Sequence, residues 1–264
     1  MSIESSQLIG VAVGNTRTMI GHVRGMEVGE TSSHPSDDPA AVAKGVSDIV
    51  ASTGPLPVVV ASVNEPAARA IAKALSEDSG DRVFRLGADL PIPILHALDD
   101  DSTVGQDRLL NAMAAHRIAG QACVVVDAGT CVTVDFVDGE GTFHGGVIAP
   151  GLQMMLDAMH HGTASLPRIV LRDSPAPAGP FGKETRGAML LGVREAVLGL
   201  VRLTLERYAE HYGAYPQVIA TGGDARTLFE GDEIIESIVP NLQLAGIAAA
   251  CLKGAEQESQ GEPE

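Results

Sequence analysis

The segment that most constrains the fold is Val124–Val134, where an apolar, β-branched run ends in the turn Asp127-Ala128-Gly129-Thr130 and a second β-branched run follows. This pattern predicts a buried β-hairpin with a functional corner. A glycine lets backbone N–H groups approach an anion, a hydroxyl can donate to a phosphate oxygen, and a carboxylate can hold a cation. The corner therefore suits a metal-bound polyphosphate, although the same four residue types also form ordinary β-turns.

A second segment of the same kind lies near the amino terminus. Residues 8–18 again combine an apolar strand, a small turn with glycine, and hydroxyl side chains that lead into another apolar run. Aligning Gly14 with Gly129 places Ala12 where the other copy has Asp127. Two matching hairpins far apart in one chain predict an internal duplication, in which one copy carries a carboxylate and the other a methyl group.

Composition limits the partners of this chain. With 264 residues, 45% hydrophobic content and 3% aromatic residues, the core must be built from aliphatic side chains, in one large or two small domains. The formal net charge of −16 argues against nucleic acid or an anionic membrane surface as a partner. Cys123, Cys131 and Cys251 lack metal-ligand spacing, so we expect reduced thiols in a cytoplasmic protein. No secretion signal or membrane-spanning run is expected.

Strand and helix signals alternate along the chain, which predicts an α/β fold with largely parallel or mixed sheets. Beyond the first hairpin, we expect a capped helix from Ser36–Pro39, and the acidic run Asp99–Asp101 is typical of a solvated loop at a domain boundary. The remaining expected strands are 57–62, 82–86, 142–148 and 216–220, and the remaining expected helices are 67–75, one opening at 105–108, 152–160 and 186–210.

Two further segments carry candidate binding chemistry. Gly105-Gln106-Asp107-Arg108 opens a helix with a carboxylate that can accept a proton and a guanidinium that can hold a carboxylate or phosphate. The structural alternative is a capping Asp beside a surface Arg. The Gly-rich turn Thr221–Asp224 can lie against a base or ribose, or it can simply connect a strand to a helix. The adjacent His160 and His161 lack a third ligand, which disfavours a metal site there.

Seven blocks in register resemble one known family, the type III pantothenate kinases. The resemblance covers about residues 8–252 and rests on the blocks Gly14–Thr16, Gly105–Arg108, Asp127–Thr130, Gly145–Gly151, Leu166–Arg168, Gly182–Thr185 and Thr221–Gly223. It implies duplicated ribonuclease H-like domains of the actin-like ATPase type, with mixed sheets and a cleft between them. The expected division is 1–103 for the first half, 104–252 for the second, and 253–264 for an acidic disordered tail.

The resemblance also implies a reaction. These enzymes transfer the γ-phosphoryl group of ATP to the primary hydroxyl of pantothenate, the first step towards coenzyme A, in the cytoplasm. By resemblance, Asp107 is the general base, Gly105–Arg108 line the pantothenate site with Arg108 on the substrate carboxylate, and Thr185 contacts pantothenate.

The cofactor sites are implied in the same way. ATP, with Mg²⁺, lies by resemblance on Gly14, Asn15, Thr16, Arg17, Thr18 and Thr130, with Gly222 and Gly223 also in contact with the nucleotide. Asp127 holds a monovalent cation, K⁺ or NH₄⁺. The family is homodimeric, and the helix that follows Gly151 is the expected interface element.

Two positions depart from the family pattern. The family carries Asp, which orients the magnesium, where this chain has Ala12, and it usually carries Tyr where this chain has Leu98. Losing a group that orients a metal costs about 10–100-fold. We therefore keep two hypotheses: an active pantothenate kinase, and a catalytically impaired relative that acts as a ligand-binding or regulatory protein.

Overall fold

The computed structural model describes residues 7–79, 82–174 and 179–261. The chain divides into two compact units, and each is described separately. Unit 1 comprises the described residues within 1–121, 137–144 and 241–264, and unit 2 comprises those within 122–136 and 145–240.

Unit 1 is built on a five-stranded mixed sheet. Its strands are β1 (Gln7–Val13), β2 (Arg17–Arg24), β3 (Glu27–Pro35), β4 (Val58–Ser62) and β5 (Val83–Arg85), in the order β3-β2-β1-β4-β5. The first three strands form an antiparallel meander, whereas β4 and β5 run parallel to β1. The carboxyl ends of β1, β4 and β5 therefore lie on the same edge of the sheet.

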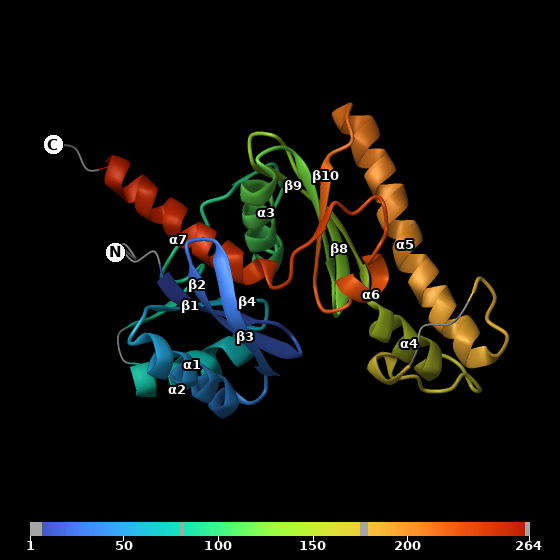
Figure 1. The fold of residues 1–264 in the computed structure, drawn as a ribbon, viewed down its shortest axis with the longest axis horizontal. Helices are drawn as coiled ribbons and strands as arrows, with labels where there is room; N and C mark the ends of the chain where they lie inside the picture. The colour runs from blue at the N-terminus through green and yellow to red at the C-terminus, as the bar shows by residue number, and fades with distance from the viewer. Residues whose placement is uncertain (1–6, 80–81, 175–178, 262–264) are drawn as a thin grey trace. The chain divides into compact units, whose positions relative to one another are not determined.

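Both faces of this sheet are covered by helices. Alternate residues of β1 point to opposite faces, so Ile9, Val11 and Val13 pack with α1 (Pro39–Thr53) and α2 (Glu65–Ser79). Figure 1 shows these two helices side by side below the sheet. Leu8 and Ala12 belong to a second apolar cluster with α3 (Gln106–Ala119) and α7 (Leu242–Gly261).

Close packing of α3 on α7 depends on Gly246. A side chain at this position would overlap the backbone of Leu110, which lies on α3. The expected cap of α1 is confirmed, because the Asp38 carboxylate accepts the Ala41 N–H at 3.0 Å and Pro39 follows it as the first helical residue.

A six-stranded sheet contains the strands of the second hairpin. Its order is β11-β10-β7-β8-β9-β6. The bounds are β6 (Leu95–His96), β7 (Cys123–Ala128), β8 (Cys131–Val137), β9 (Thr142–Pro150), β10 (Gln217–Thr221) and β11 (Ser237–Ile238). The series β9-β8-β7-β10-β11 repeats the order of β3-β2-β1-β4-β5, and the β7–β10 and β10–β11 pairs are again parallel. This repeat confirms the predicted duplication and the ribonuclease H-like, actin-like fold class.

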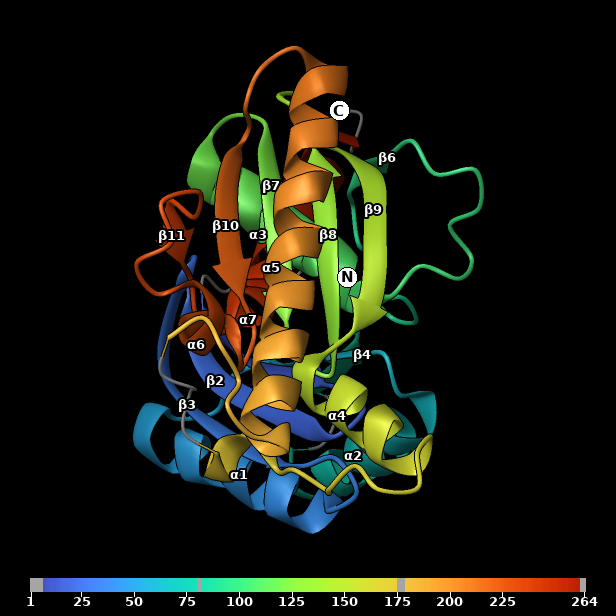
Figure 2. The ribbon, with the colours of Figure 1, turned by 90° about the vertical axis from the view of Figure 1, so that its right-hand side faces the viewer.

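The helices of unit 2 are α4 (Leu152–His161), α5 (Thr185–Tyr212) and α6 (Ala225–Phe229), with a 3₁₀ turn at Leu171–Asp173. Figure 2 shows α5 running along the sheet beside β8 and β10. Its apolar side chains pack on the buried valines of the second hairpin, and Tyr208 on α5 donates a hydrogen bond to the Val134 carbonyl at 3.1 Å.

The structure contains elements that the sequence did not predict, among them the two-residue strands β6 and β11. The strand β3 and the helix α7 were not predicted, because β3 is rich in Ser, Thr and Glu and α7 carries little helical amphipathicity. The tail expected to be disordered is helical through Gly261, and residues 262–264 lie outside the described part. The predicted boundary between the two halves at residue 103 stays a prediction. The compact units follow a different division, in which α7 belongs to unit 1.

All three cysteines are free thiols, as predicted. Burial raises the pKa of Cys123 and of Cys251 to about 12, so both stay protonated at neutral pH. In the described part of the chain, no helix is both long enough and apolar enough to span a bilayer.

Candidate active site

The first predicted phosphate turn lies at the carboxyl end of β1 in unit 1. The Gly14 N–H donates to the Arg17 carbonyl at 3.0 Å, and a side chain at Gly14 would stand 2.8 Å from that oxygen. Only glycine therefore closes this turn without displacing the backbone. Asn15 and Thr16 at its tip are exposed.

The two residues after the tip hold the turn onto its neighbours. Arg17 donates to the Ser33 hydroxyl at 2.6 Å and to the Ser33 carbonyl at 2.7 Å. Thr18 is fully buried, and its hydroxyl lies 3.0 Å from that of Ser36. Thr18 thus supports the hairpin from inside, and the tip residues Asn15 and Thr16 are the ones exposed to solvent.

Ala12 lies on β1 just before this turn. Its side chain is 3% exposed and packs in the apolar cluster with Val59 and Ala61. This position offers no oxygen ligand to a divalent cation. Among the described residues, no group of three or more His, Cys, Asp or Glu side chains is placed to bind a metal.

The predicted catalytic residues begin helix α3. Gly105 is its N-cap, and a side chain there would overlap the Asp107 carboxylate. Asp107 accepts the backbone N–H of Arg108 at 2.8 Å. The Arg108 guanidinium carbon lies 5.5 Å from the centroid of the Phe143 ring, which is fully buried. A cation over an aromatic face is attracted to the ring.

Unit 1 brings this helix start to the first phosphate turn. The Gln106 side chain accepts the N–H of Ser62 at 3.1 Å, and Ser62 at the end of β4 pairs with Val13 at the end of β1. The next residue, Val63, donates to the Val13 carbonyl at 3.1 Å. The helix start and the Gly14 turn therefore share the carboxyl edge of the parallel strands, which is where α/β sheets bind ligands.

Unit 2 has a corresponding edge at the ends of β7 and β10. Asp127 lies beside Thr221 in the parallel pairing of these strands. Gly222 has φ +96°, and a side chain there would stand 2.5 Å from the Asp127 Oδ1 atom and overlap the Ala128 carbonyl. The predicted Gly-rich turn is thus packed directly on the predicted second phosphate turn.

The rest of that turn is held by backbone contacts. The Gly151 N–H donates to the Thr130 carbonyl at 3.0 Å, and a side chain at Gly151 would overlap the Gly129 carbonyl. Helix α4 therefore starts against the turn. Thr130 itself is exposed, so its hydroxyl is accessible to a ligand.

A pocket of about 310 Å³ opens beside Gly223 in unit 2. Its wall is apolar apart from Asp224, two arginines and two hydroxyl residues. The lining residues are Leu152, Leu171, Arg172, Ser174, Leu190, Val193, Arg194, Gly223, Asp224, Thr227 and Leu228.

Asp224 is the one carboxylate in this pocket lining. Burial raises its pKa, and within the described part of the chain its carboxylate accepts no hydrogen bond. The Arg194 guanidinium in the same lining donates to the carbonyls of Thr227 and Leu228. A desolvated acceptor facing a pocket is suited to hydroxyl or amine donors of a ligand.

Thr185 begins α5 and is exposed. Its neighbour Glu184 caps the helix, accepting N–H groups of Arg186 and Gly187 at 2.8 and 2.5 Å. Thr185 also lines an apolar groove of about 760 Å³ between α4 and α5. Methionine side chains dominate that groove, namely Met154, Met155, Met159 and Met189.

The sequence interpretation missed three residues that organise these surfaces. Phe143 lies under the Arg108 guanidinium, the Ser62 N–H donates to Gln106, and Asp224 supplies a half-buried carboxylate. Asp224 could have been found from its place directly after Gly222-Gly223 at a strand end. Phe143 and Ser62 carry no local signal, because their roles depend on partners distant in sequence.

A family model described as type III pantothenate kinase matches residues 8–207. A type III pantothenate kinase of Dehalococcoides mccartyi strain CBDB1 is 31% identical over 253 residues, which cover 92% of this chain and 94% of the relative. The chain belongs to the type III pantothenate kinase family. Another such protein, from Acidiphilium cryptum, is 40% identical over 156 residues, 59% of this chain and 58% of that relative. The aligned part thus spans little more than half the length of this relative.

A solved structure agrees with the family's fold. A Baf family transcriptional activator from Campylobacter jejuni has a TM-score of 0.54 at 18% identity, covering 96% of this chain and 100% of its own. At this identity the likeness concerns the fold alone. For this member of the pantothenate kinase family, it supports the ribonuclease H-like architecture derived from the strand order.

Proposed function

We propose that this protein is a pantothenate kinase that transfers the γ-phosphoryl group of ATP to the primary hydroxyl of pantothenate in the cytoplasmic synthesis of coenzyme A. One observation carries the proposal: in a chain of this family, Asp107 is the second residue of a helix whose first residue, Gln106, is hydrogen-bonded to the strand edge bearing the Gly14 turn. A carboxylate beside a phosphate-binding turn is the arrangement that phosphoryl transfer to a hydroxyl requires.

The residues of this chain receive the following roles. Asp107 accepts the proton of the attacking hydroxyl, and Arg108, oriented over Phe143, binds the substrate carboxylate. Gly105 leaves room for the Asp107 carboxylate, and Thr185 contacts pantothenate. These groups position the substrate and handle its proton and charge, which is most of what phosphoryl transfer needs from a protein.

The phosphate donor is assigned to the two turns and the pocket. Within unit 1, we assign phosphate contacts to Gly14–Arg17, with Thr18 supporting this turn from inside. Within unit 2, we assign a phosphate contact to Thr130 and nucleoside contacts to Gly222, Gly223 and the pocket at Asp224. A magnesium ion that accompanies ATP would neutralise charge on the transferred group. Asp127 and nearby backbone carbonyl oxygens provide the hard ligands that a monovalent cation such as K⁺ or NH₄⁺ prefers.

We also propose a homodimer that uses the apolar groove between α4 and α5. The groove lining is almost free of polar atoms, and Met154 in it is 41% exposed. Thr185, assigned to the substrate, lines the same groove. A second copy covering this face would bury the methionines beside the substrate contact.

The test is phosphopantothenate formation by the purified protein with ATP, Mg²⁺ and K⁺, compared with an Ala12→Asp variant. We expect turnover in the parent. The turnover rate should rise about 10–100-fold in the Ala12→Asp variant, because position 12 gains a carboxylate that can orient the metal. The introduced carboxylate also enters an apolar cluster, so we expect a lower free energy of unfolding in the absence of Mg-ATP, with a larger loss at a pH of about 8 than at about 4.

The outcomes separate the two hypotheses. A silent parent with an active Ala12→Asp variant indicates a kinase scaffold disabled at its metal, which is the impaired relative of the alternative hypothesis. Silence in both, together with no pantothenate binding by calorimetry, would contradict the proposed function.

Asp224→Asn is expected to weaken ATP use while stabilising the fold. Loss of a charged acceptor for the nucleoside should raise KM for ATP about 3–10-fold, with kcat little changed. Burial raises the pKa of Asp224 above its unfolded value, so the ionised carboxylate lowers stability as pH rises from about 4 upward. The variant should therefore melt at a higher temperature than the parent at a pH of about 7, and the two should converge below a pH of about 4. Equal KM values, or no pH-dependent difference in melting, would contradict the assignment.

A further inference from the structure

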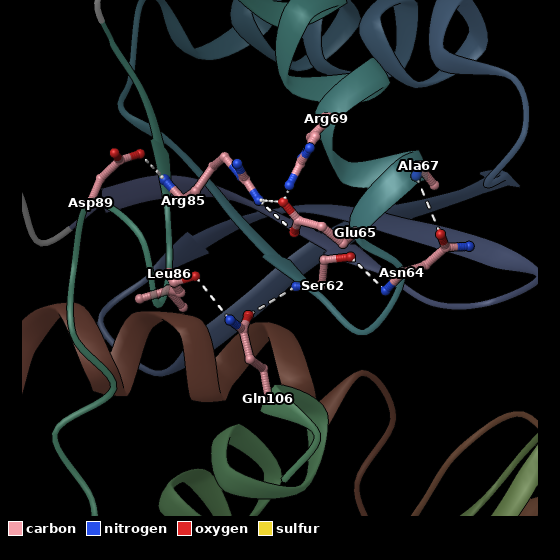
Figure 3. Close-up of polar contacts among 9 residues, drawn as sticks. All are labelled: Ser62, Asn64, Glu65, Ala67, Arg69, Arg85, Leu86, Asp89 and Gln106. Atoms are coloured by element: carbon pink, nitrogen blue, oxygen red, sulfur yellow. Dashed lines mark hydrogen bonds and ion pairs between the residues drawn. The ribbon is translucent and has the colours of Figure 1, made fainter. Parts of the chain in front are cut away.

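The side chain of Gln106 joins three elements of unit 1. Its Oε1 atom accepts the Ser62 N–H at the end of β4 at 3.1 Å, and its Nε2 atom donates to the Leu86 carbonyl just after β5 at 3.0 Å. Figure 3 shows this amide reaching from the start of α3 to both strand ends. Both functional groups of the amide are thus engaged with backbone.

The chain around Leu86 is shaped to receive this amide. Gly87 follows with φ +81°, and a side chain there would stand 2.5 Å from the Gln106 Nε2 atom. Its N–H closes a turn by donating to the Leu90 carbonyl at 2.7 Å. Glycine is required here both for the left-handed backbone and for the close approach of Gln106.

Both strand ends are fixed by further contacts. The Ser62 hydroxyl accepts the Asn64 N–H at 2.8 Å, and Arg85 on β5 binds the Glu65 carboxylate at 2.6 Å. Hydrogen bonds from Arg69 and Arg85 lower the pKa of Glu65, so it is ionised at neutral pH. Figure 3 shows these contacts beside the Gln106 amide. Gln106 therefore forms its hydrogen bonds with a part of the sheet edge that other polar contacts hold in place.

The N-cap of α3 supplies no side-chain anchor of its own. It is Gly105, which makes no capping side-chain hydrogen bond. Gln106 is the first residue of the helix and Asp107 the second. Fixing the Gln106 side chain on two strands therefore fixes the backbone that carries the Asp107 carboxylate.

We propose that Gln106 is a positioning residue, which holds Asp107 in place by clasping the ends of β4 and β5, and that it does not itself contact pantothenate. This inference rests on the proposed function for its kinetic consequence. The two hydrogen bonds of the Gln106 side chain, to Ser62 and Leu86, are here called the clasp, and both lie within unit 1.

The experiment compares Gln106→Glu and Gln106→Met with the parent and with the exposed control Gln257→Glu. At alkaline pH the ionised Glu can still accept the Ser62 N–H but repels the Leu86 carbonyl, and Met can do neither. We expect kcat to fall about 10–100-fold in both variants, because a small displacement of a catalytic group has such a cost. KM for pantothenate should stay within about threefold, since no substrate contact is lost.

The Glu variant adds a pH signature. A protonated carboxyl has the same donor and acceptor pattern as the amide, so it can donate to Leu86 and accept from Ser62. The ratio of variant to parent kcat should rise as pH falls from about 8 towards the carboxyl pKa, about 4.3 when unperturbed. The Met variant should show no such rise, and Gln257→Glu should match the parent at every pH.

A second readout does not need activity. Amide hydrogen exchange at Ser62, Asp107 and Arg108 should accelerate in Gln106→Met and stay unchanged in Gln257→Glu. A raised KM with unchanged kcat would mean that Gln106 contacts substrate, and unchanged exchange would mean that no clasp exists; either overturns the inference. If the parent does not phosphorylate pantothenate, the proposed function fails, while exchange at these three amides still decides whether Gln106 holds the helix start.

Discussion

Replacing Asp107 by Asn is expected to lower kcat for pantothenate phosphorylation about 10²–10⁴-fold, the usual contribution of a positioned general base. Asn is almost the same size, and its side-chain oxygen can still accept the Arg108 N–H that Asp107 accepts at 2.8 Å. The variant should therefore fold with nearly the parent's stability and lose only the proton acceptor. The measurement is steady-state turnover, with melting temperature recorded on the same samples.

A matched control removes a carboxylate elsewhere. Asp48 on α1 is exposed and pairs with Lys44, so Asp48→Asn changes the net charge in the same way without touching the sheet edge. It should retain full turnover. Residual activity in Asp107→Asn above about one tenth of the parent's, on the order-of-magnitude scale of base catalysis, would exclude Asp107 as the base.

Gly222→Ala is expected to lower the free energy of unfolding by about 2–5 kcal/mol, because the substitution strains the backbone and overfills a packed site. Gly222 has φ +96°, and its added methyl group would meet the Asp127 carboxylate and the Ala128 carbonyl. The same displacement would separate the Gly-rich turn from the second phosphate turn. Chemical denaturation measures the loss, and nucleotide binding should weaken in parallel.

Two other glycines separate the cost of backbone strain from the cost of steric overlap. Gly231 has φ +80° with nothing within 4 Å of an added methyl group, so Gly231→Ala measures backbone strain alone. Gly223 has open space and no left-handed backbone, so its replacement by Ala should leave stability nearly unchanged. If Gly222→Ala lowers the free energy of unfolding no more than Gly231→Ala does, the overlap of the added methyl group with Asp127 does not contribute to stability.

Much of the fold could be predicted from local pattern. The two hairpins, the alternation of strands and helices, and the cap at Asp38 depend on side chains within a few residues of one another. The acidic run Asp99–Asp101 was predicted as a loop and is one. Strand β3 was missed because its side chains are mostly polar, and it is held by backbone pairing with β2 instead.

In the candidate site, too, local pattern predicted some features and long-range contacts decided the others. Residue types and their order predicted which segments carry phosphate and substrate chemistry, because Gly, Thr, Asp and Arg have fixed chemical capacities wherever they lie. The partners of those residues depend on contacts between distant segments. Thr18 was predicted at the phosphates, yet its hydroxyl faces Ser36 in the interior.

The sequence by itself determined the duplicated hairpins, the aliphatic core and the position of a carboxylate at the start of α3. Only the tertiary structure decided that Gln106 grips the ends of β4 and β5, that Phe143 lies under Arg108, and that Asp224 is desolvated in a pocket. The physical reason is the distance along the chain over which each kind of interaction acts. Turn and strand preferences act over a few bonds, whereas the orientation and pKa of a side chain depend on whichever atoms the fold brings beside it.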